Sequence, residues 1–240
     1  MQLSKVTHVT VAGRIVSLTS IVQEIERRAE AHEIGRLQEI RKELKGKKQL
    51  PSSIFHPNTI KEKDGYAFHY GGRTELQFNV AFERGGMFRD GVAFSIEKSR
   101  DVLEPEKTLL PSVKRFNNFM ESNPRQFSDM WMWHWDENGE RSTDYRPAPI
   151  QADLVRRGMF IFLGRMQPSN AVDYDLILDD FDRLLPLYQF VESMAPAAPN
   201  SKADALARAG KLNCRITPGS RAIRRRSANF LIADKPRTTI

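Results

Sequence analysis

The chain contains 240 residues, of which 40% are hydrophobic and 28% are charged, and it carries a net charge of +7. This apolar content allows a sizeable core, so the length fits one large folded domain with an appendage. The single cysteine, Cys214, excludes an internal disulfide, the scattered histidines exclude a four-ligand zinc site, and no apolar run approaches the roughly 20 residues that span a bilayer. The first residues also lack the pattern of a secretory signal, so we expect a cytoplasmic protein.

The positive charge is concentrated at the two ends of the chain. Residues 195–240 carry a net charge of +8 and residues 1–50 a net charge of +4, which leaves −5 for residues 51–194. This asymmetry favours a nucleic acid or another polyanion as the partner. A basic tail that only keeps the protein in solution is the alternative interpretation.

Apolar spacing predicts an N-terminal segment over residues 1–50, a core domain over 51–194, and a linker with a basic tail over 195–240. Within the first segment, residues 5–16 are typical of a strand or extended arm, and a helical stretch follows that Gly35 interrupts. In the core, alternation predicts strands and a period of 3.6 predicts helices. The predicted strands are 66–70, 74–83, 88–98, 130–135 and 159–163, and the predicted helices are 105–122 and 173–192.

These elements predict the α+β class. The short Gly-Gly connections at 71–72 and 85–86 favour an antiparallel meander for the first three strands. We therefore expect an antiparallel sheet of about five strands of mixed length, packed by helices, with an N-terminal helical segment and a basic C-terminal tail.

Three tryptophans stand at alternate positions of one predicted strand. Trp131, Trp133 and Trp135 therefore share one face of that strand, opposite Met132 and His134. A flat surface of indoles can stack a nucleobase or enclose a methylated one. Core packing alone is the alternative explanation, because indoles bury large areas.

A metal-dependent nuclease is a second possibility. Asp64 precedes Glu75 and Gln77 in a pattern similar to that of restriction-type nucleases, in which acidic groups on neighbouring strands bind Mg²⁺ and orient water. Gln77 stands where such sites usually carry lysine. An ordinary polar face of a sheet also explains the pattern.

The remaining acidic residues have structural explanations. Asp90, in the sequence Arg-Asp-Gly, is predicted to begin a turn. The aspartates of the last helix are predicted to cap its start and to form a solvated face, and they are Asp173, Asp175, Asp179, Asp180 and Asp182.

Arginines supply candidate phosphate contacts. Arg224, Arg225 and Arg226 are consecutive in the tail and offer bidentate contacts to phosphate, and Arg73 and Arg115 are expected to add contacts beside the tryptophans.

Residues 66–193 contain the segments Gly72-Arg-Thr-Glu-Leu-Gln-Phe-Asn-Val, Gly91-Val-Ala-Phe-Ser-Ile-Glu, Leu110-Pro-Ser-Val-Lys-Arg-Phe-Asn-Asn-Phe, Met132-Trp-His-Trp and Phe160-Ile-Phe-Leu-Gly. These segments resemble a module of bacterial restriction and phage-defence proteins. The resemblance implies a module that senses modified DNA or accompanies a nuclease.

The sequence thus favours a DNA-binding module over an enzyme, with DNA as the partner, no cofactor and no membrane association. Two alternatives stay open. One is the Mg²⁺-dependent nuclease, and the other is a subunit of a defence complex that binds a protein partner or a second copy of itself.

Overall fold

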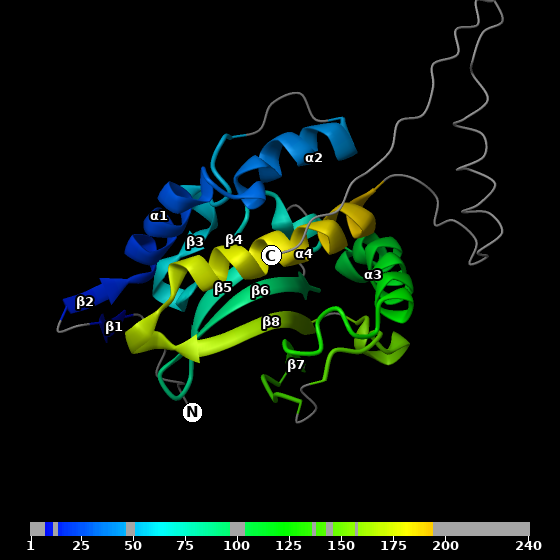
Figure 1. Ribbon diagram of the computed structural model, residues 1–240. Helices are drawn as coiled ribbons and strands as arrows, with labels where there is room; N and C mark the ends of the chain where they lie inside the picture. Colours follow the sequence, from blue (N-terminus) through cyan, green and yellow to red (C-terminus); the bar gives the residue numbers. More distant parts are fainter. Residues whose placement is uncertain are drawn as a thin grey trace, which may run out of the picture. The chain divides into compact units, whose positions relative to one another are not determined.

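Helices cover one face of an antiparallel sheet in the computed structural model of the protein (Figure 1). The residues that the structure describes belong to one unit, Met1–Pro196, and are 8–11, 14–46, 51–96, 104–135, 138–142, 146–156 and 158–193. The predicted linker and basic tail lie outside the described residues.

The N-terminal segment forms a hairpin followed by two helices. Strands β1 (His8–Val11) and β2 (Arg14–Ser17) pair with each other, and α1 (Leu18–Ala29) and α2 (Leu37–Lys45) flank a short 3-10 turn, η1 (Glu33–Arg36). The predicted interruption at Gly35 is therefore confirmed.

Six further strands build the main sheet in the order β3-β4-β5-β6-β8-β7, and every neighbouring pair is antiparallel. The α+β class is confirmed, and the sheet exceeds the expected size only by the two-residue strand β3. The elements after α2 are η2 (Pro57–Thr59), β3 (Ile60–Lys61), η3 (Glu62–Asp64), β4 (Tyr66–Phe68), η4 (Gly72–Thr74), β5 (Gln77–Glu83), β6 (Met87–Ser95), α3 (Pro105–Ser122), β7 (Trp131–Trp135), η5 (Ala152–Leu154), β8 (Phe160–Pro168), η6 (Ser169–Ala171) and α4 (Tyr174–Glu192).

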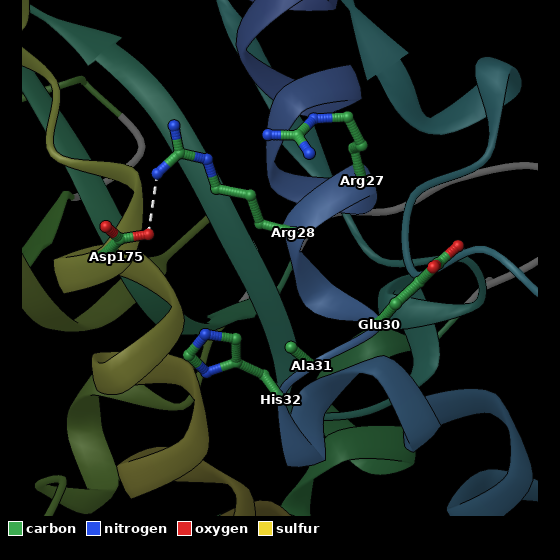
Figure 2. A pocket seen from close by; sticks show the side chains of 6 residues that line it. All are labelled: Arg27, Arg28, Glu30, Ala31, His32 and Asp175. Atoms are coloured by element: carbon green, nitrogen blue, oxygen red, sulfur yellow. Dashed lines mark hydrogen bonds and ion pairs between the residues drawn. The ribbon is translucent and has the colours of Figure 1, made fainter.

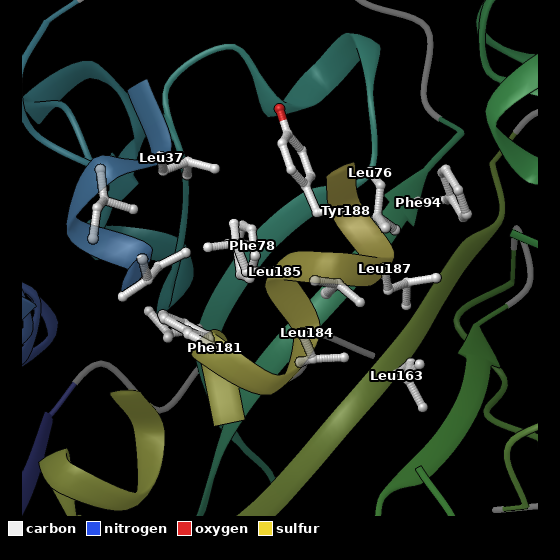
Figure 3. Packing of buried hydrophobic residues seen from close by; sticks show 14 of the residues in the cluster. Leu37, Leu76, Phe78, Phe94, Leu163, Phe181, Leu184, Leu185, Leu187 and Tyr188 are labelled. Atoms are coloured by element: carbon white, nitrogen blue, oxygen red, sulfur yellow. The ribbon is translucent and has the colours of Figure 1, made fainter. Parts of the chain in front are cut away.

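Helix α4 lies across the sheet and forms the centre of the core (Figure 3). Asp173 begins this helix because its carboxylate accepts from the backbone N–H groups of Asp175 and Leu176, each at 3.1 Å. Phe181 of α4 meets the Phe78 ring of β5 edge to face at 5.2 Å. Burying each such side chain contributes about 1.5–3 kcal/mol, so the docking of α4 stabilises this face of the sheet.

None of the helices in the described part has both the length and the apolar character that a bilayer crossing needs.

Candidate functional site

The two faces of the main sheet differ in character because side chains alternate along each strand. We call the face that packs against α4 the helix face and the opposite one the open-side face. The helix face includes Phe78, Val80, Val92, Phe94, Ile161, Leu163 and Met132. The open-side face includes Gln77, Asn79, Glu83, Arg89, Ala93, Phe160, Phe162 and the tryptophans of β7.

The tryptophans of β7 share the open-side face, as their spacing predicts. Trp133 is buried, with 1% exposure, whereas Trp131 is 44% exposed. The Trp133 ring lies 5.0 Å from both the Trp135 and the Phe162 rings. The strand thus presents one anchored indole and one that solvent reaches.

A buried arginine lies among these rings. The Nε of Arg89 donates to Asn79 Oδ1 at 3.0 Å, and its guanidinium forms an ion pair with Glu83. Burial lowers the pKa of Arg89, although Glu83 opposes that effect. The guanidinium carbon lies 4.8–5.5 Å from the centres of the Trp133, Trp135, Phe160 and Phe162 rings. On the open-side face, aromatic rings therefore surround the positively charged guanidinium group of Arg89.

Three polar atoms from uncharged side chains of this face are buried without a hydrogen-bond partner among the described residues. They are Gln77 Oε1, Asn79 Nδ2 and Trp133 Nε1. The Asn79 amide orientation is fixed because its oxygen accepts from Arg89, so its Nδ2 is a donor. Each such group costs about 1–3 kcal/mol when it is left unpaired, which makes a cluster of them on one face unusual in a folded protein.

Two glycines face each other in the middle of the same face. Gly91 of β6 pairs with Gly164 of β8, and Asn79 and Trp131 flank this pair on the neighbouring strands. A Cβ at Gly164 would lie 2.1 Å from the Asp90 carbonyl oxygen, so the backbones approach too closely for any other residue. The Phe162 ring also lies against Gly164, where an added Cβ would come within 2.7 Å of Phe162 Cζ.

Further arginines border the open-side face. Arg73 donates to Ser95 Oγ at 2.7 Å and to Tyr66 OH at 2.8 Å, while Arg141 lies 4.2 Å above the Trp133 ring. Together with Arg89, whose charge pairs with Glu83, they place three guanidinium groups next to aromatic rings.

The other predicted arginines do not belong to this face in the described part. Arg115 of α3 donates to the Val191 carbonyl and to Ser112 Oγ, so it ties α3 to α4 on the helix side. Arg224, Arg225 and Arg226 lie outside the described residues.

The structure does not assemble the acidic set of the nuclease alternative. The carbonyl oxygen of Gly65, next to Asp64, accepts from the N–H of Phe82 near the end of β5, whereas Gln77 begins that strand. Five residues of extended strand separate the two positions by roughly 17 Å. Within the described ranges, no three His, Cys, Asp or Glu side chains are placed to hold a metal ion.

Glu75 instead centres a buried ionic cluster. Its carboxylate accepts from Arg41 Nε and His69 Nε2, each at 2.7 Å, and from Tyr188 OH at 3.1 Å, and it pairs with Lys45. Burial opposes its ionisation, but the hydrogen bond from His69 and the nearby cations outweigh burial and hold the pKa of Glu75 well below its usual range. Its role is to connect α2, the loop before β5 and α4.

His69 completes this cluster as a neutral group. Its Nδ1 accepts from the backbone N–H of Phe78 at 2.9 Å, so its proton is on Nε2 and points at Glu75. Burial lowers the pKa of His69, which keeps the ring uncharged. Both ring nitrogens are occupied, so His69 has no atom left for a ligand.

The structure corrects two of the sequence-based predictions, one for Asp90 and one for Asp180. It does not begin a turn but lies in the middle of β6, fully buried, where its Oδ1 accepts from Gln167 Nε2 at 3.0 Å. Burial and the nearby Asp180 raise the pKa of Asp90 to about 8. Asp180 is also buried rather than solvated, and Arg165 Nε donates to it at 2.5 Å. The turn was predicted from residue types alone, which cannot distinguish a buried strand glycine from a turn glycine.

A surface hollow of about 440 Å³ lies between α1 and the start of α4 (Figure 2). It is lined by Arg27, Arg28, Glu30, Ala31, His32 and Asp175. Most of its charged groups already have partners: Arg28 donates to Asp175 at 2.7 Å, Glu24 accepts from both arginines, and His32 pairs with Asp182. Few of the charges in the hollow are therefore left for a ligand.

The chain matches no family model, no curated protein and no solved structure. Its function has to be argued from the chemistry of its own residues.

Sequence reasoning found the tryptophans but missed Asn79 and Arg89. Alternation with Leu76, Phe78 and Val80 predicts a polar, solvent-facing side for Asn79, yet the residue is fully buried. The signal available in the sequence was the apolar run that contains Gly91, which is typical of a strand buried on both faces and which pairs with Asn79 in the structure.

Proposed function

We propose that the protein binds DNA through the open-side face and uses its aromatic rings to accommodate a base. The observation that carries this proposal is that Gln77, Asn79 and Trp133 each leave a buried polar atom unpartnered on the face that also holds the adjacent Trp133 and Trp135 indoles. A nucleobase supplies both a flat ring for the indoles and hydrogen-bonding groups along its edge.

The charge of the face agrees with such a ligand. Arg73, Arg89 and Arg141 provide positive charge next to rings, and guanidinium groups bind phosphate and also stack on bases.

The basic tail would add affinity that does not depend on sequence. Arg224, Arg225 and Arg226 would contact phosphates while the open-side face recognises the base, because backbone contacts position a protein and base contacts specify its site. Recognition of a modified base and a place in a bacterial restriction or defence system are part of this proposal, and both rest on the sequence resemblance.

Fluorescence anisotropy of the full-length protein with one labelled duplex, unmodified and cytosine-methylated, tests the proposal across a salt series. We expect affinity that falls steeply with salt and differs between the two duplexes. Replacing all three tail arginines by alanine should weaken binding to every duplex and flatten the salt dependence.

Trp131→Ala probes the face itself, and Phe190→Ala is its matched control. Both side chains are large, aromatic and similarly exposed, at 44% and 42%, but Phe190 belongs to α4 on the other side of the sheet. Trp131→Ala should weaken binding about tenfold, the typical contribution of one stacked base, while Phe190→Ala should not. Absence of DNA binding at low salt would refute the proposal.

A further inference from the structure

We propose that Asp90 and the charged side chains around it form a proton-dependent latch, which holds the first half of α4, residues 174–182, on the sheet. The latch lies on the helix face and does not depend on the proposed function. Two separate polar clusters attach α4 to the rest of the fold, and the one at Asp90 needs a bound proton to balance its charges.

The first cluster fixes the beginning of α4. Gln167 of β8 donates to Asp90 Oδ1 at 3.0 Å, and its Oε1 accepts from the backbone N–H of Asp173, the N-cap of α4, at 2.7 Å. Arg165, also on β8, donates to both carboxylate oxygens of Asp180 in α4. Asp90 and Asp180 are both buried. Two side chains of β8 therefore hold the first half of the helix beside Asp90.

The charges around Asp90 balance only when the cluster holds one proton. Two guanidinium groups, those of Arg165 and Arg183, each pair with Asp180 and with Asp129 from the loop before β7. These four groups are neutral together, so Asp90 adds a third carboxylate without a third cation. Because the other two carboxylates each meet both cations, Asp90 is the member that takes up the proton.

The surroundings of Asp90 do not compensate a charge on it. On β5 its partner in the sheet is the apolar Val80. Its Oδ2 is buried and has no hydrogen-bond partner within the described ranges. Burial and the nearby Asp180 carboxylate raise the pKa of Asp90 to about 8, although Gln167 and Arg165 oppose this effect. The closed latch therefore strongly favours the protonated acid.

The second cluster fixes the end of α4 and is centred on Glu75. Tyr188 OH donates to Glu75 Oε1 at 3.1 Å, and Glu192 Oε1 accepts from the backbone N–H of Leu76 at 2.9 Å. Burial opposes the ionisation of Glu75, but the hydrogen bond from His69 and the nearby cations hold its pKa well below the usual range. Glu75 thus keeps its charge at neutral pH, and the second half of α4 should stay attached when Asp90 ionises.

The proton stabilises the closed latch at low pH. Opening of the first half of α4 would bring water to Asp90 and return its pKa toward the ordinary value of 3.8. Between that value and about 8, the closed form holds a proton that the open form has released, so the open population should grow about tenfold per pH unit. Above pH 8 it should level off, because both forms are then ionised.

Hydrogen exchange of the full-length protein, read by mass spectrometry from peptides of α4, tests the latch between pH 5 and pH 8. Exposure times are scaled so that the pH dependence of the intrinsic exchange rate cancels. We expect the protection of residues 174–182 to fall about tenfold per pH unit. The protection of residues 187–192 should change by less than about threefold over the whole range.

Asp90→Asn removes the titrating group and keeps an oxygen for the Gln167 donor. In this variant the protection of the first half of α4 should no longer depend on pH. Asp153→Asn, which changes an exposed aspartate, is the matched control and should retain the profile of the natural protein. The comparison of the two helix halves needs no variant, so it tests the latch even if Asp90→Asn does not fold.

Each outcome supports or overturns the latch. Loss of protection that is confined to the first half and that Asp90→Asn abolishes supports it. An equal slope in both halves would overturn it, because Asp90 would then act only through global unfolding. Protection of the first half that does not change with pH would also overturn it, and so would a slope that Asp90→Asn retains.

Discussion

Replacing the buried carboxyl of Asp90 by an amide should stabilise the protein at neutral pH. Asp90 lies between β6 and α4, where Gln167 Nε2 donates to its Oδ1 and the Asp180 carboxylate is close by. An amide at this position would retain an oxygen for Gln167 and would place an N–H group toward Asp180. Asp90→Asn therefore keeps the contacts of the protonated acid without the need for a bound proton.

The size of the effect follows from the pKa of Asp90, which burial and Asp180 raise from 3.8 to about 8. Between these values the folded protein keeps a proton that the unfolded chain has released. The free energy of unfolding then falls as the pH rises, by at most about 1.4 kcal/mol per pH unit. At pH 7 this penalty reaches roughly 4 kcal/mol, and below pH 4 it vanishes because both states are protonated.

Urea unfolding followed by circular dichroism at pH 4.5 and pH 7.5 measures this difference. Asp90→Asn should exceed the natural protein in stability by several kcal/mol at the higher pH and by much less at the lower one. Asp153→Asn, which changes an exposed aspartate, is the control and should show neither effect. The reasoning is refuted if Asp90→Asn destabilises the protein at pH 7.5, or if its effect is the same at both values.

Three further substitutions test the buried ionic cluster around Glu75 and the burial of the β7 tryptophans. Glu75→Gln removes the charge that Arg41 and Lys45 share in the buried cluster, and we expect a loss of about 3 kcal/mol in a urea titration; a loss below about 1 kcal/mol would contradict the importance of that charge. Trp133→Ala should cost about 3–5 kcal/mol in the same assay, and Trp131→Ala distinctly less, because the first indole is 1% exposed and the second 44%; equal losses would contradict the difference in burial.

Local periodicity was sufficient to predict most of the secondary structure. The alternation in β5 and β7 predicted which side chains share a face, and the helices at 105–122 and 173–192 were predicted within one residue of their observed bounds. These features depend on the spacing of residues a few positions apart, which can be read directly from the sequence.

Long-range pairing was not accessible in this way. Glu75 meets Arg41 from α2 and Tyr188 from α4, partners that are 34 and 113 residues away. The same applies to Asp90 and Asp180, whose contact depends on the placement of α4 over β6. A carboxylate that is paired from three elements has the same sequence signature as one that awaits a metal ion, so the nuclease alternative could be assessed only from the fold.

Unpaired atoms on the two sheet faces of the described part have different consequences. On the helix face, Asp90 Oδ2 lacks a partner, but the raised pKa gives it a proton to donate towards Asp180. On the open-side face, the unpaired atoms are an amide oxygen, an amide nitrogen and an indole nitrogen. None of these groups titrates, so a change of protonation cannot give them a hydrogen bond. Apolar residues would remove that cost, so the retention of three polar atoms there favours a ligand that completes their hydrogen bonds. The functional proposal therefore depends on the open-side face, whereas the helix face accounts for stability and its pH dependence.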